Sequence, residues 1–448
     1  MYTYQDLLGV RDFEAERMDF VKRVVSSHKG TELYKTACVA DDYRAQKNRT
    51  IIQYQKLLYT VSGQAVPDNF SANYKLTSNY FSRFITQENQ FLLGNGVTWN
   101  DNATAERLGE DFDTQLQQAG KYALSGGVSF GFWNLNKLDV FPVTEFAPLF
   151  DEDDGAIKAG VRFWQVDGSK PLRATLYELD GYTEYIWRRG ENGAVLHEKM
   201  PYVLDVISTE ADGQEIYNGE NYPAFPIVPL WANDMHQSEL VGMRENIDAY
   251  DLIKSGFANT VDEASMVYWT INNAGGMDDI DLAQFINHMR TVKAATVEED
   301  GARAESHVIE APYGSREAIL DRLEKDLYKD SMALNTDAIA NGAITATQIK
   351  AAYEPLNSKA DDYEYQVRKF IKGILNVAGI EDTPTFTRSY LINTNEEIGT
   401  VLAAANYLDD DYVTQKVLTI LGDGDKAEEV LKAIDENSMD RFVAKESE

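Results

Sequence analysis

The sequence predicts an α+β protein of several domains, because its helical and its β-rich stretches occupy separate parts of the chain. Between Glu239 and Val377, apolar residues recur at steps of three and four, the spacing that places them on one face of a helix. From Tyr122 to Trp231, short aromatic and β-branched runs are separated by turn residues. With 448 residues, of which 44% are hydrophobic, the chain has the length of about three domains.

Residues 1–120 are expected to be mainly helical, with breaks where Ser, Gly and Pro gather at 26–30 and 62–69. The first 60 residues carry ten Lys/Arg and eight Asp/Glu, which is a net charge of +2. Because the whole chain has a formal net charge of −31, the other 388 residues carry −33. Such an acidic chain is unsuited to ordinary nucleic-acid binding, which depends on Lys and Arg displacing counterions. The N-terminal segment is either the side that meets an acidic partner or an ordinary solvated surface.

Residues 121–237 are expected to form an antiparallel meander of β-hairpins. Asp-Gly and Asn-Gly pairs separate the strand-like runs, and such pairs are strong signals of hairpin turns. The acidic run at 151–155 resembles a calcium-binding loop, but its glycine comes one position too early for that pattern. We therefore expect a solvated hairpin tip at this run and no metal site.

Two long helices are predicted at 238–265 and 313–334, on either side of an insert at 266–312 that mixes strand-like and helical patterns. Helices of about 24 residues reach about 36 Å, longer than most helices of compact domains. Their apolar stripes have too little partner surface within the chain, which predicts contacts between the subunits of a ring. The residues expected at these contacts are Leu240, Met243, Ile247, Tyr250, Phe257, Leu320, Leu323 and Leu327.

A loop is predicted at 335–347, between the second long helix and a third. Its residues are small and almost uncharged, and the Asn-Gly pair within it is a turn signal. These features favour a flexible connection between rigid helices. The loop contains Asn335, Thr336, Asp337, Ala338, Ile339, Ala340, Asn341, Gly342, Ala343, Ile344 and Thr345.

The third long helix is predicted within 348–394 and contains Pro355. Because proline removes a backbone hydrogen bond, we expect a kink in this helix. The remainder of the chain, 395–448, is expected to form short helices separated by acidic turns.

The sequence contains no local signature of catalysis or of cofactor binding. It lacks the phosphate-binding loop of nucleotide hydrolases, the HExxH zinc motif and the GxSxG nucleophile turn. The five histidines are scattered singly, and the single cysteine, Cys38, indicates a reducing compartment. We therefore predict no cofactor and no metal. Abundant Asp and Glu leave open a carboxylate pair in an acidic carbohydrate hydrolase.

The sequence also predicts a soluble protein made in the cytoplasm. No apolar run approaches the roughly 18 residues that a membrane-spanning helix needs. The N-terminal stretch is too charged for a secretory signal.

Five segments together resemble the siphophage-type portal proteins of tailed bacteriophages. They occur in the order and spacing of that family over roughly residues 30–380, on an architecture of the matching kind. The segments are ADDYRAQKN from Ala40, NYKLTSNYFSRFITQENQFLLGNGVTW from Asn73, FPIVPLWAN from Phe225, SEL from Ser238, and IDAYD from Ile247 with Ser255.

The resemblance implies a portal-type multidomain protomer with long stem helices, a β-rich wing, a small α/β clip and a helical crown. Residues 1–120 and 121–237 would be the helical and β-rich parts of the wing. The other parts would be a stem of the helices at 238–265 and 313–334, a clip at 266–312, a tunnel loop at 335–347, a long kinked wing helix with its connection at 348–394, and a crown at 395–448.

The resemblance also implies a ring of about twelve subunits at one capsid vertex, around a channel through which double-stranded DNA is packaged and ejected. The implied partners are the terminase large subunit, the major capsid and scaffolding proteins and a head-tail adaptor. The protein would be a virion component assembled in the host cytoplasm, neither an enzyme nor bound to a membrane. An acidic channel wall suits this role because it gives sliding DNA little to bind. A carbohydrate hydrolase and a non-portal oligomeric scaffold or adaptor are the alternatives.

Overall fold

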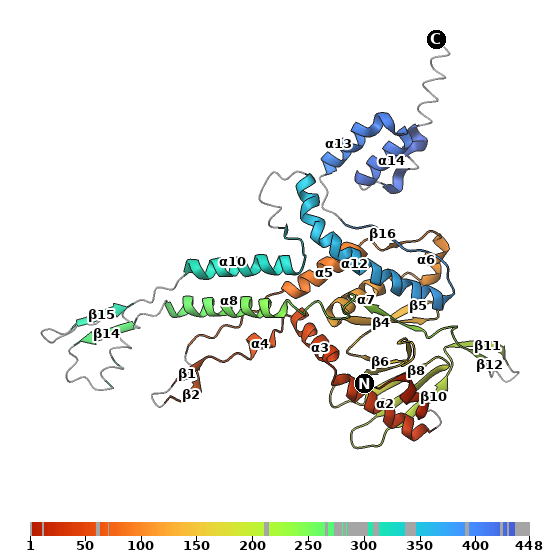
Figure 1. Cartoon of the computed structure of the whole chain (residues 1–448), viewed down its shortest axis with the longest axis horizontal. Coiled ribbons are helices and arrows are strands. Elements are labelled where there is room, and N and C mark those ends of the chain that lie inside the picture. Colours follow the sequence, from red (N-terminus) through yellow and green to blue (C-terminus); the bar gives the residue numbers. More distant parts are fainter. Residues whose placement is uncertain are drawn as a thin grey trace, which may run out of the picture.

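In the computed structural model, the chain forms a body of sheets and helices from which a helical hairpin and a separate helix pair project (Figure 1). Helices and sheets occupy separate stretches of the sequence, which confirms the α+β prediction. The structure describes residues 2–10, 13–59, 63–69, 71–209, 215–264, 268–272, 280, 284, 303–307, 313–336, 346–389, 394–421, 424–427 and 430–434.

The chain begins with four helices, α1 (Tyr4–Gly9), α2 (Glu14–Lys29), α3 (Glu32–Arg44) and α4 (Arg49–Ile52). Three of them start after a residue whose side chain accepts a hydrogen bond from a backbone amide of the first helical turn. Thr3 accepts from Asp6 N, Thr31 from Tyr34 N and Asn48 from Thr50 N. The buried side chains of α2 recur at helical spacing and pack against the largest sheet. A short hairpin follows, formed by β1 (Leu57–Tyr59) and β2 (Ala65–Pro67).

The β-rich region contains two antiparallel sheets and a two-stranded ribbon, which confirms the predicted meander. The larger sheet has the order β10-β9-β8-β7-β6, with β6 (Phe146–Phe150), β7 (Ile157–Trp164), β8 (Leu172–Glu178), β9 (Gly181–Trp187) and β10 (Ala194–Met200). The smaller has the order β13-β4-β5, with β4 (Val128–Asn134), β5 (Lys137–Pro142) and β13 (Ile227–Trp231). The ribbon is β11 (Val203–Thr209) with β12 (Glu215–Glu220).

The acidic run at 151–155 is the turn between β6 and β7, as expected of a hairpin tip. The ammonium group of Lys158 pairs with the carboxylates of Asp151 and Asp154, the latter at 2.9 Å. A lysine therefore offsets part of the negative charge of this turn.

The main core lies where two helices pack against the smaller sheet and a third packs on both of them. The first two are α7 (Phe112–Gly126) and α12 (Ala346–Ala378), and the third is α5 (Tyr80–Leu93). Gly131 of β4 permits the close approach of α12, because a Cβ atom at this position would collide with the ring of Phe370. α12 continues past Pro355 without interruption, and the predicted kink stays a prediction. Nearby lie α6 (Asn102–Leu108) and the short pair β3 (Val97–Thr98) and β16 (Thr385–Phe386).

The projecting hairpin consists of α8 (Arg244–Ala264) and α10 (Tyr313–Asp330). Both helices are shorter than predicted, because the chain forms turns at 239–243 and 331–332 at the base of the hairpin. At its far end β14 (Tyr268–Asn272) pairs antiparallel with β15 (Arg303–His307). Most of the rest of the predicted insert at 266–312 lies outside the described residues.

The C-terminal region has short helices, as predicted: α13 (Thr394–Ala404), η1 (Ala405–Tyr407), α14 (Asp410–Leu421) and η2 (Gly424–Lys426). Of all helices in the described part of the chain, none combines the length and the apolar composition needed to cross a bilayer.

Candidate functional site at the base of the stem hairpin

The hairpin of α8 with α10 corresponds to the predicted stem, and we call it the stem hairpin. It is held by polar contacts near both of its ends. Near the body, Asn246 Nδ2 donates to Asp330 Oδ2 at 2.9 Å. Near the far end, Arg316 Nη1 donates to the Gly256 carbonyl at 3.3 Å and to Thr260 Oγ1 at 2.5 Å. The two helices lie side by side in Figure 1 and contact each other along their length. The hairpin therefore has the form of a rigid strut.

An extended segment at 71–79, which we call the strap, lies along α8 and pairs with no strand of the described residues. Three alternate amides of the strap donate to side chains on one face of α8: Tyr74 N to Asn259 Oδ1 (2.7 Å), Leu76 N to Ser255 Oγ (3.0 Å) and Ser78 N to Asp251 Oδ1 (2.8 Å). Two residues of extended chain advance about 6.6 Å. Four residues of helix advance about 6.0 Å. Because these repeats nearly match, a line of polar side chains on a helix can replace a partner strand.

The same face of α8 also holds the segment that precedes α4. Asn48 Nδ2 donates to Asp248 Oδ1 at 2.8 Å and to Asp251 Oδ2 at 3.0 Å, and the Tyr43 hydroxyl donates to Asp248 Oδ1. Asp251 is fully buried, and burial raises its pKa although the donors from Ser78 and Asn48 lower it. We call this set of contacts, with the strap, the α8 zipper. It joins two other parts of the chain, the segment with Tyr43 and Asn48 and the strap, to α8 of the stem hairpin.

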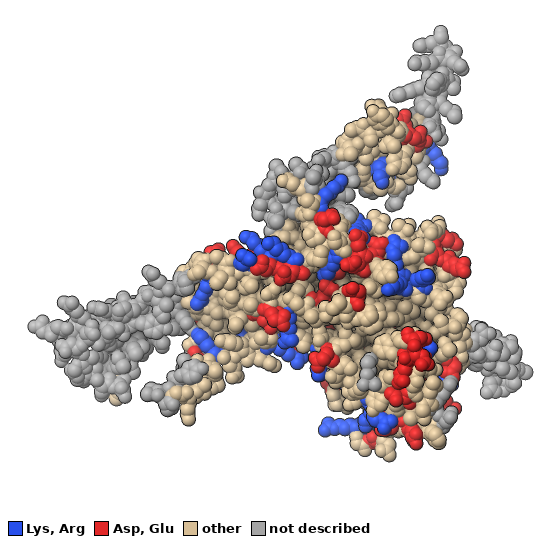
Figure 2. All heavy atoms as spheres, viewed as in Figure 1, with Lys and Arg blue, Asp and Glu red and all other residues tan. Residues whose placement is uncertain are grey.

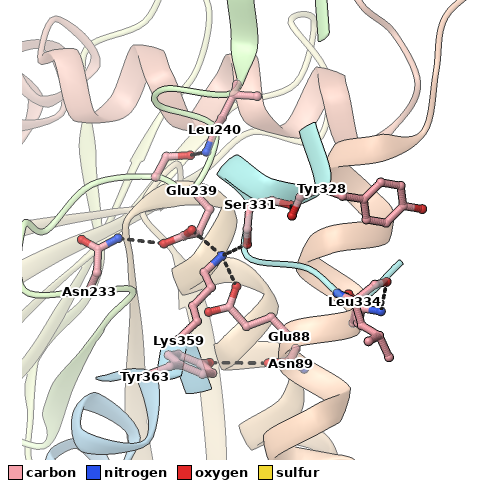
Figure 3. Close-up of polar contacts among 12 residues, drawn as sticks. Glu88, Asn89, Asn233, Glu239, Leu240, Tyr328, Ser331, Leu334, Lys359 and Tyr363 are labelled. Atoms are coloured by element: carbon pink, nitrogen blue, oxygen red, sulfur yellow. Dashed lines mark hydrogen bonds and ion pairs between the residues drawn. The ribbon is translucent and has the colours of Figure 1, made fainter. Parts of the chain in front are cut away.

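A second polar joint, the Lys359 cluster, lies where α5, α10 and α12 meet (Figure 3). Lys359 Nζ lies 2.7 Å from Glu88 Oε2 and 2.7 Å from Glu239 Oε2, and it donates to the Ser331 carbonyl at 3.3 Å. Asn233 Nδ2 donates to Glu239 Oε1 at 2.9 Å. Lys359 thus ties the end of α10 to α5 and to the turn before α8.

The charges of this cluster do not balance, because two carboxylates share one ammonium group in a buried place. Burial raises the pKa of Glu88 to about 7; Lys359 opposes this shift, and Glu239 adds to it. The two carboxylates raise the pKa of Lys359 against the effect of its own burial. Lys359 therefore stays charged at neutral pH, while Glu88 exchanges between its charged and neutral forms.

The cluster fixes the chain just before the predicted tunnel loop. Gln87 Nε2 donates to the Leu334 carbonyl at 3.0 Å, and Leu334 N donates to Gln87 Oε1 at 2.9 Å. Asn335 and Thr336 follow this reciprocal pair. Ala346 and Thr347, also predicted as loop, belong instead to α12. The other residues predicted for the loop lie outside the described residues: Asp337, Ala338, Ile339, Ala340, Asn341, Gly342, Ala343, Ile344 and Thr345.

The chain matches the family described as "Phage portal protein, SPP1 Gp6-like" over residues 34–440. It belongs to this family of phage portal proteins. The match spans the wing, stem and crown regions expected from the sequence. Family membership decides between the three classes that the sequence left open, in favour of the portal class.

Two curated portal proteins are similar to the chain. The portal protein of Clostridium phage phiCD119 is 29% identical over 185 residues, which cover 39% of this chain and 41% of that protein. The portal protein of Bacillus phage SPP1 is 24% identical over 383 residues, which cover 76% of this chain and 72% of that protein.

Solved structures of gene transfer agent particles also align with the chain, at 12% identity. The neck of an empty particle, computed with C6 symmetry, has a TM-score of 0.44 and covers 77% of this chain and 90% of that chain. The neck of a native particle, computed with C12 symmetry, has a TM-score of 0.43 and covers 75% and 89%.

The segments that carry the portal resemblance in the sequence meet at the two polar joints. Three of the segments form the α8 zipper. They contribute Tyr43 with Asn48, the strap, and Asp251 with its neighbours. Asn233 and Glu239 come from two others and belong to the Lys359 cluster. In this portal protein the resembling segments thus serve to mount the stem hairpin on the body.

The predicted stem contacts divide into two groups. Leu240, Met243, Ile247 and Leu327 are buried in the chain's own main core, so the prediction that they contact a neighbouring subunit is wrong. They lie at the base of the hairpin, where the body covers them. Tyr250, Phe257, Leu320 and Leu323 are only partly buried, and their contact with a neighbour stays a prediction. The surface of the hairpin further exposes Leu252 (42%), Val261 (47%) and Ile319 (47%).

Lys359, Glu88 and the side chains of the α8 zipper were missed as site residues. A signal for the zipper exists in the sequence, since Asp248, Asp251, Ser255 and Asn259 repeat at steps of three and four along an otherwise amphipathic helix. Lys359 has no comparable signal, because its partners are far away in sequence.

The described residues contain no cluster of His, Cys, Asp and Glu that could hold a metal ion. On the face shown in Figure 2, Lys and Arg side chains lie among Asp and Glu side chains and form no continuous basic stripe.

Proposed function

We propose that the protein assembles into a closed ring of about twelve copies, whose axial channel passes double-stranded DNA at one vertex of a phage capsid. Membership of a portal family supports this proposal. The structural observation that carries it is the stem hairpin, a rigid strut whose base is locked into the body while large apolar side chains stay exposed along it. A neighbouring stem in a ring would cover these side chains.

The other parts of the chain then take the following roles. The predicted loop at 335–347 would face the DNA, and the Lys359 cluster would hold its start. The far end of the stem hairpin, at β14 and β15, would meet the head-tail adaptor. The terminase large subunit, the scaffolding protein and the major capsid protein would be further partners during assembly in the host cytoplasm. The formal net charge of −31 supports a wall that gives phosphates little to bind.

Negative-stain images and native mass spectrometry of the purified full chain test the proposal. We expect rings with an axial hole and the mass of about twelve copies. Only monomers or dimers at micromolar concentration would refute it. The chain should also turn over no ATP, because its sequence lacks a phosphate-binding loop and the motor would be the terminase.

A further inference from the structure

A small arm projects beside the stem hairpin, formed by β1 and β2 (Figure 1). These strands pair with each other, from Leu57 opposite Pro67 to Tyr59 opposite Ala65, and with no other strand of the described chain. A single two-stranded hairpin is at best marginally stable in water. An arm of this size therefore needs support from something outside itself.

The base of the arm is firmly held. Asp68 N donates to the Lys56 carbonyl at 2.8 Å, and Ser71 N donates to the buried Asp68 carboxylate at 3.0 Å. The strap that follows is fixed to α8 by the zipper, and α4, just before the arm, also contacts α8. The arm therefore leaves the stem hairpin at a defined place.

The arm and its base expose large apolar side chains. Five of them are 39–49% exposed within a short stretch of chain: Ile52, Tyr54, Leu57, Val66 and Tyr74. Single exposed apolar residues are ordinary, but several together on a projecting element mark an interaction surface.

The strands of the arm carry no charged residue, but the chain on either side of them differs in charge from the rest of the protein. Residues 46–75 contain four basic residues, Lys47, Arg49, Lys56 and Lys75, and one acidic residue, Asp68, so their formal net charge is +3. The whole chain carries −31, so the rest of it carries −34. Arg49 pairs with Asp42 within the chain, so the positive charge beside the arm comes mainly from Lys47, Lys56 and Lys75. A basic base of the arm on an acidic protein is complementary to the surface of a second copy of the same chain.

We propose that the arm of one copy docks on the acidic surface of the next copy and clamps neighbouring subunits together. This inference rests on the proposed ring. The contact is heterologous, because the arm of each copy meets a different surface of its neighbour, and such contacts close when the subunits form a ring. Docking would cover the exposed apolar side chains, and the charge difference would favour the correct approach of the two copies.

The test compares ring assembly of the full chain with that of Leu57→Asp/Val66→Asp and of Lys56→Glu/Lys75→Glu. We expect each double variant to raise the concentration of half-assembly at least tenfold, by native mass spectrometry and sedimentation. Added salt should weaken the contact in the wild-type protein. It should therefore bring the concentrations of half-assembly of the wild type and of Lys56→Glu/Lys75→Glu closer together. The matched control is Val166→Asp, because Val166 is 86% exposed in the turn between β7 and β8 and should leave assembly unchanged. Circular dichroism and thermal unfolding verify that each variant is folded.

A photo-crosslinking residue in place of Leu57 gives an independent readout that needs no loss of assembly. We expect crosslinks between copies of this chain in the assembled ring. Crosslinks only within one chain, or only to another virion protein in assembled particles, would overturn the proposal. If wild type and folded arm variants assemble equally well, the arm is not a clamp although the ring stands. If wild type forms no ring, the proposed function fails as well.

Discussion

At the scale of single residues, Lys359 has the largest expected effect on stability. Its ammonium group is the shared partner of two carboxylates, so Lys359→Met would leave Glu88 and Glu239 close together without a cation. Removal of one partner from a buried ion pair typically costs several kcal/mol, and we expect a loss of about 3 kcal/mol in the free energy of unfolding. Urea denaturation measures it. Lys372→Met, at an exposed position of the same helix, is the control and should stay within about 0.5 kcal/mol of wild type.

The pKa of Glu88 predicts how stability depends on pH. Burial raises the pKa of this carboxyl to about 7 in the folded protein, against 4.5 for an exposed glutamate. Between these values the folded chain binds the proton more strongly than the unfolded chain, so this residue's stabilising contribution declines as the pH rises from about 5 to about 7. Urea midpoints across this range should fall more steeply for wild type than for Glu88→Gln. Equal slopes would show that Glu88 does not titrate there.

At the scale of elements, the α8 zipper predicts slow hydrogen exchange in a segment that pairs with no strand in the described chain. The amide of Leu76 donates to Ser255 Oγ, so Ser255→Ala removes its acceptor. We expect faster exchange at Leu76 with smaller changes at Tyr74 and Ser78, and a stability loss of about 1 kcal/mol. Amide-resolved hydrogen exchange measures the pattern. Unchanged exchange at Leu76 would mean that the strap is protected by something other than α8.

The elements themselves were largely predictable, because helix and hairpin patterns are local. The steps of three and four along α8 and the Asp-Gly turns among β6 to β10 depend on neighbouring residues only. The same periodicity shows which face of a helix is apolar but not what covers it. Leu240 and Leu327 were therefore assigned to a neighbouring subunit, although the chain's own body buries them.

The two polar joints could not be predicted in the same way, because their partners are far apart in sequence. Glu88, Glu239 and Lys359 come together only when α5, α12 and the turn before α8 are packed. Of these, Glu88 and Glu239 lie within segments that resemble portal proteins, but no local pattern indicated that Lys359 is their partner. The resemblance identified the segments, and the structure shows that their side chains join the stem hairpin to the body.

At the scale of the whole molecule, the two polar joints at the base of the stem hairpin explain how a ring could hold the predicted DNA-facing loop at a fixed radius. The reciprocal bonds between Gln87 and Leu334 fix the chain two residues before Thr336, and α12 begins again at Ala346. In a ring of about twelve copies, any charge placed in the intervening loop is repeated about twelve times around the channel. Small changes of charge in the loop should therefore have large effects on DNA movement.

Asp337 is the charged residue of the predicted loop and gives the sharpest test of this idea. Asp337→Lys would place a ring of cations around the DNA, and each new phosphate contact adds to a grip that salt weakens. We expect slower packaging, most strongly at low salt. Asp337→Asn is the matched control, because it removes the same negative charge without creating a phosphate ligand, and it should be much milder. The measurement is the length of DNA packaged per procapsid for both variants across a salt series. Equal behaviour of the two variants, or no salt dependence for the lysine variant, would show that this part of the loop does not face the DNA.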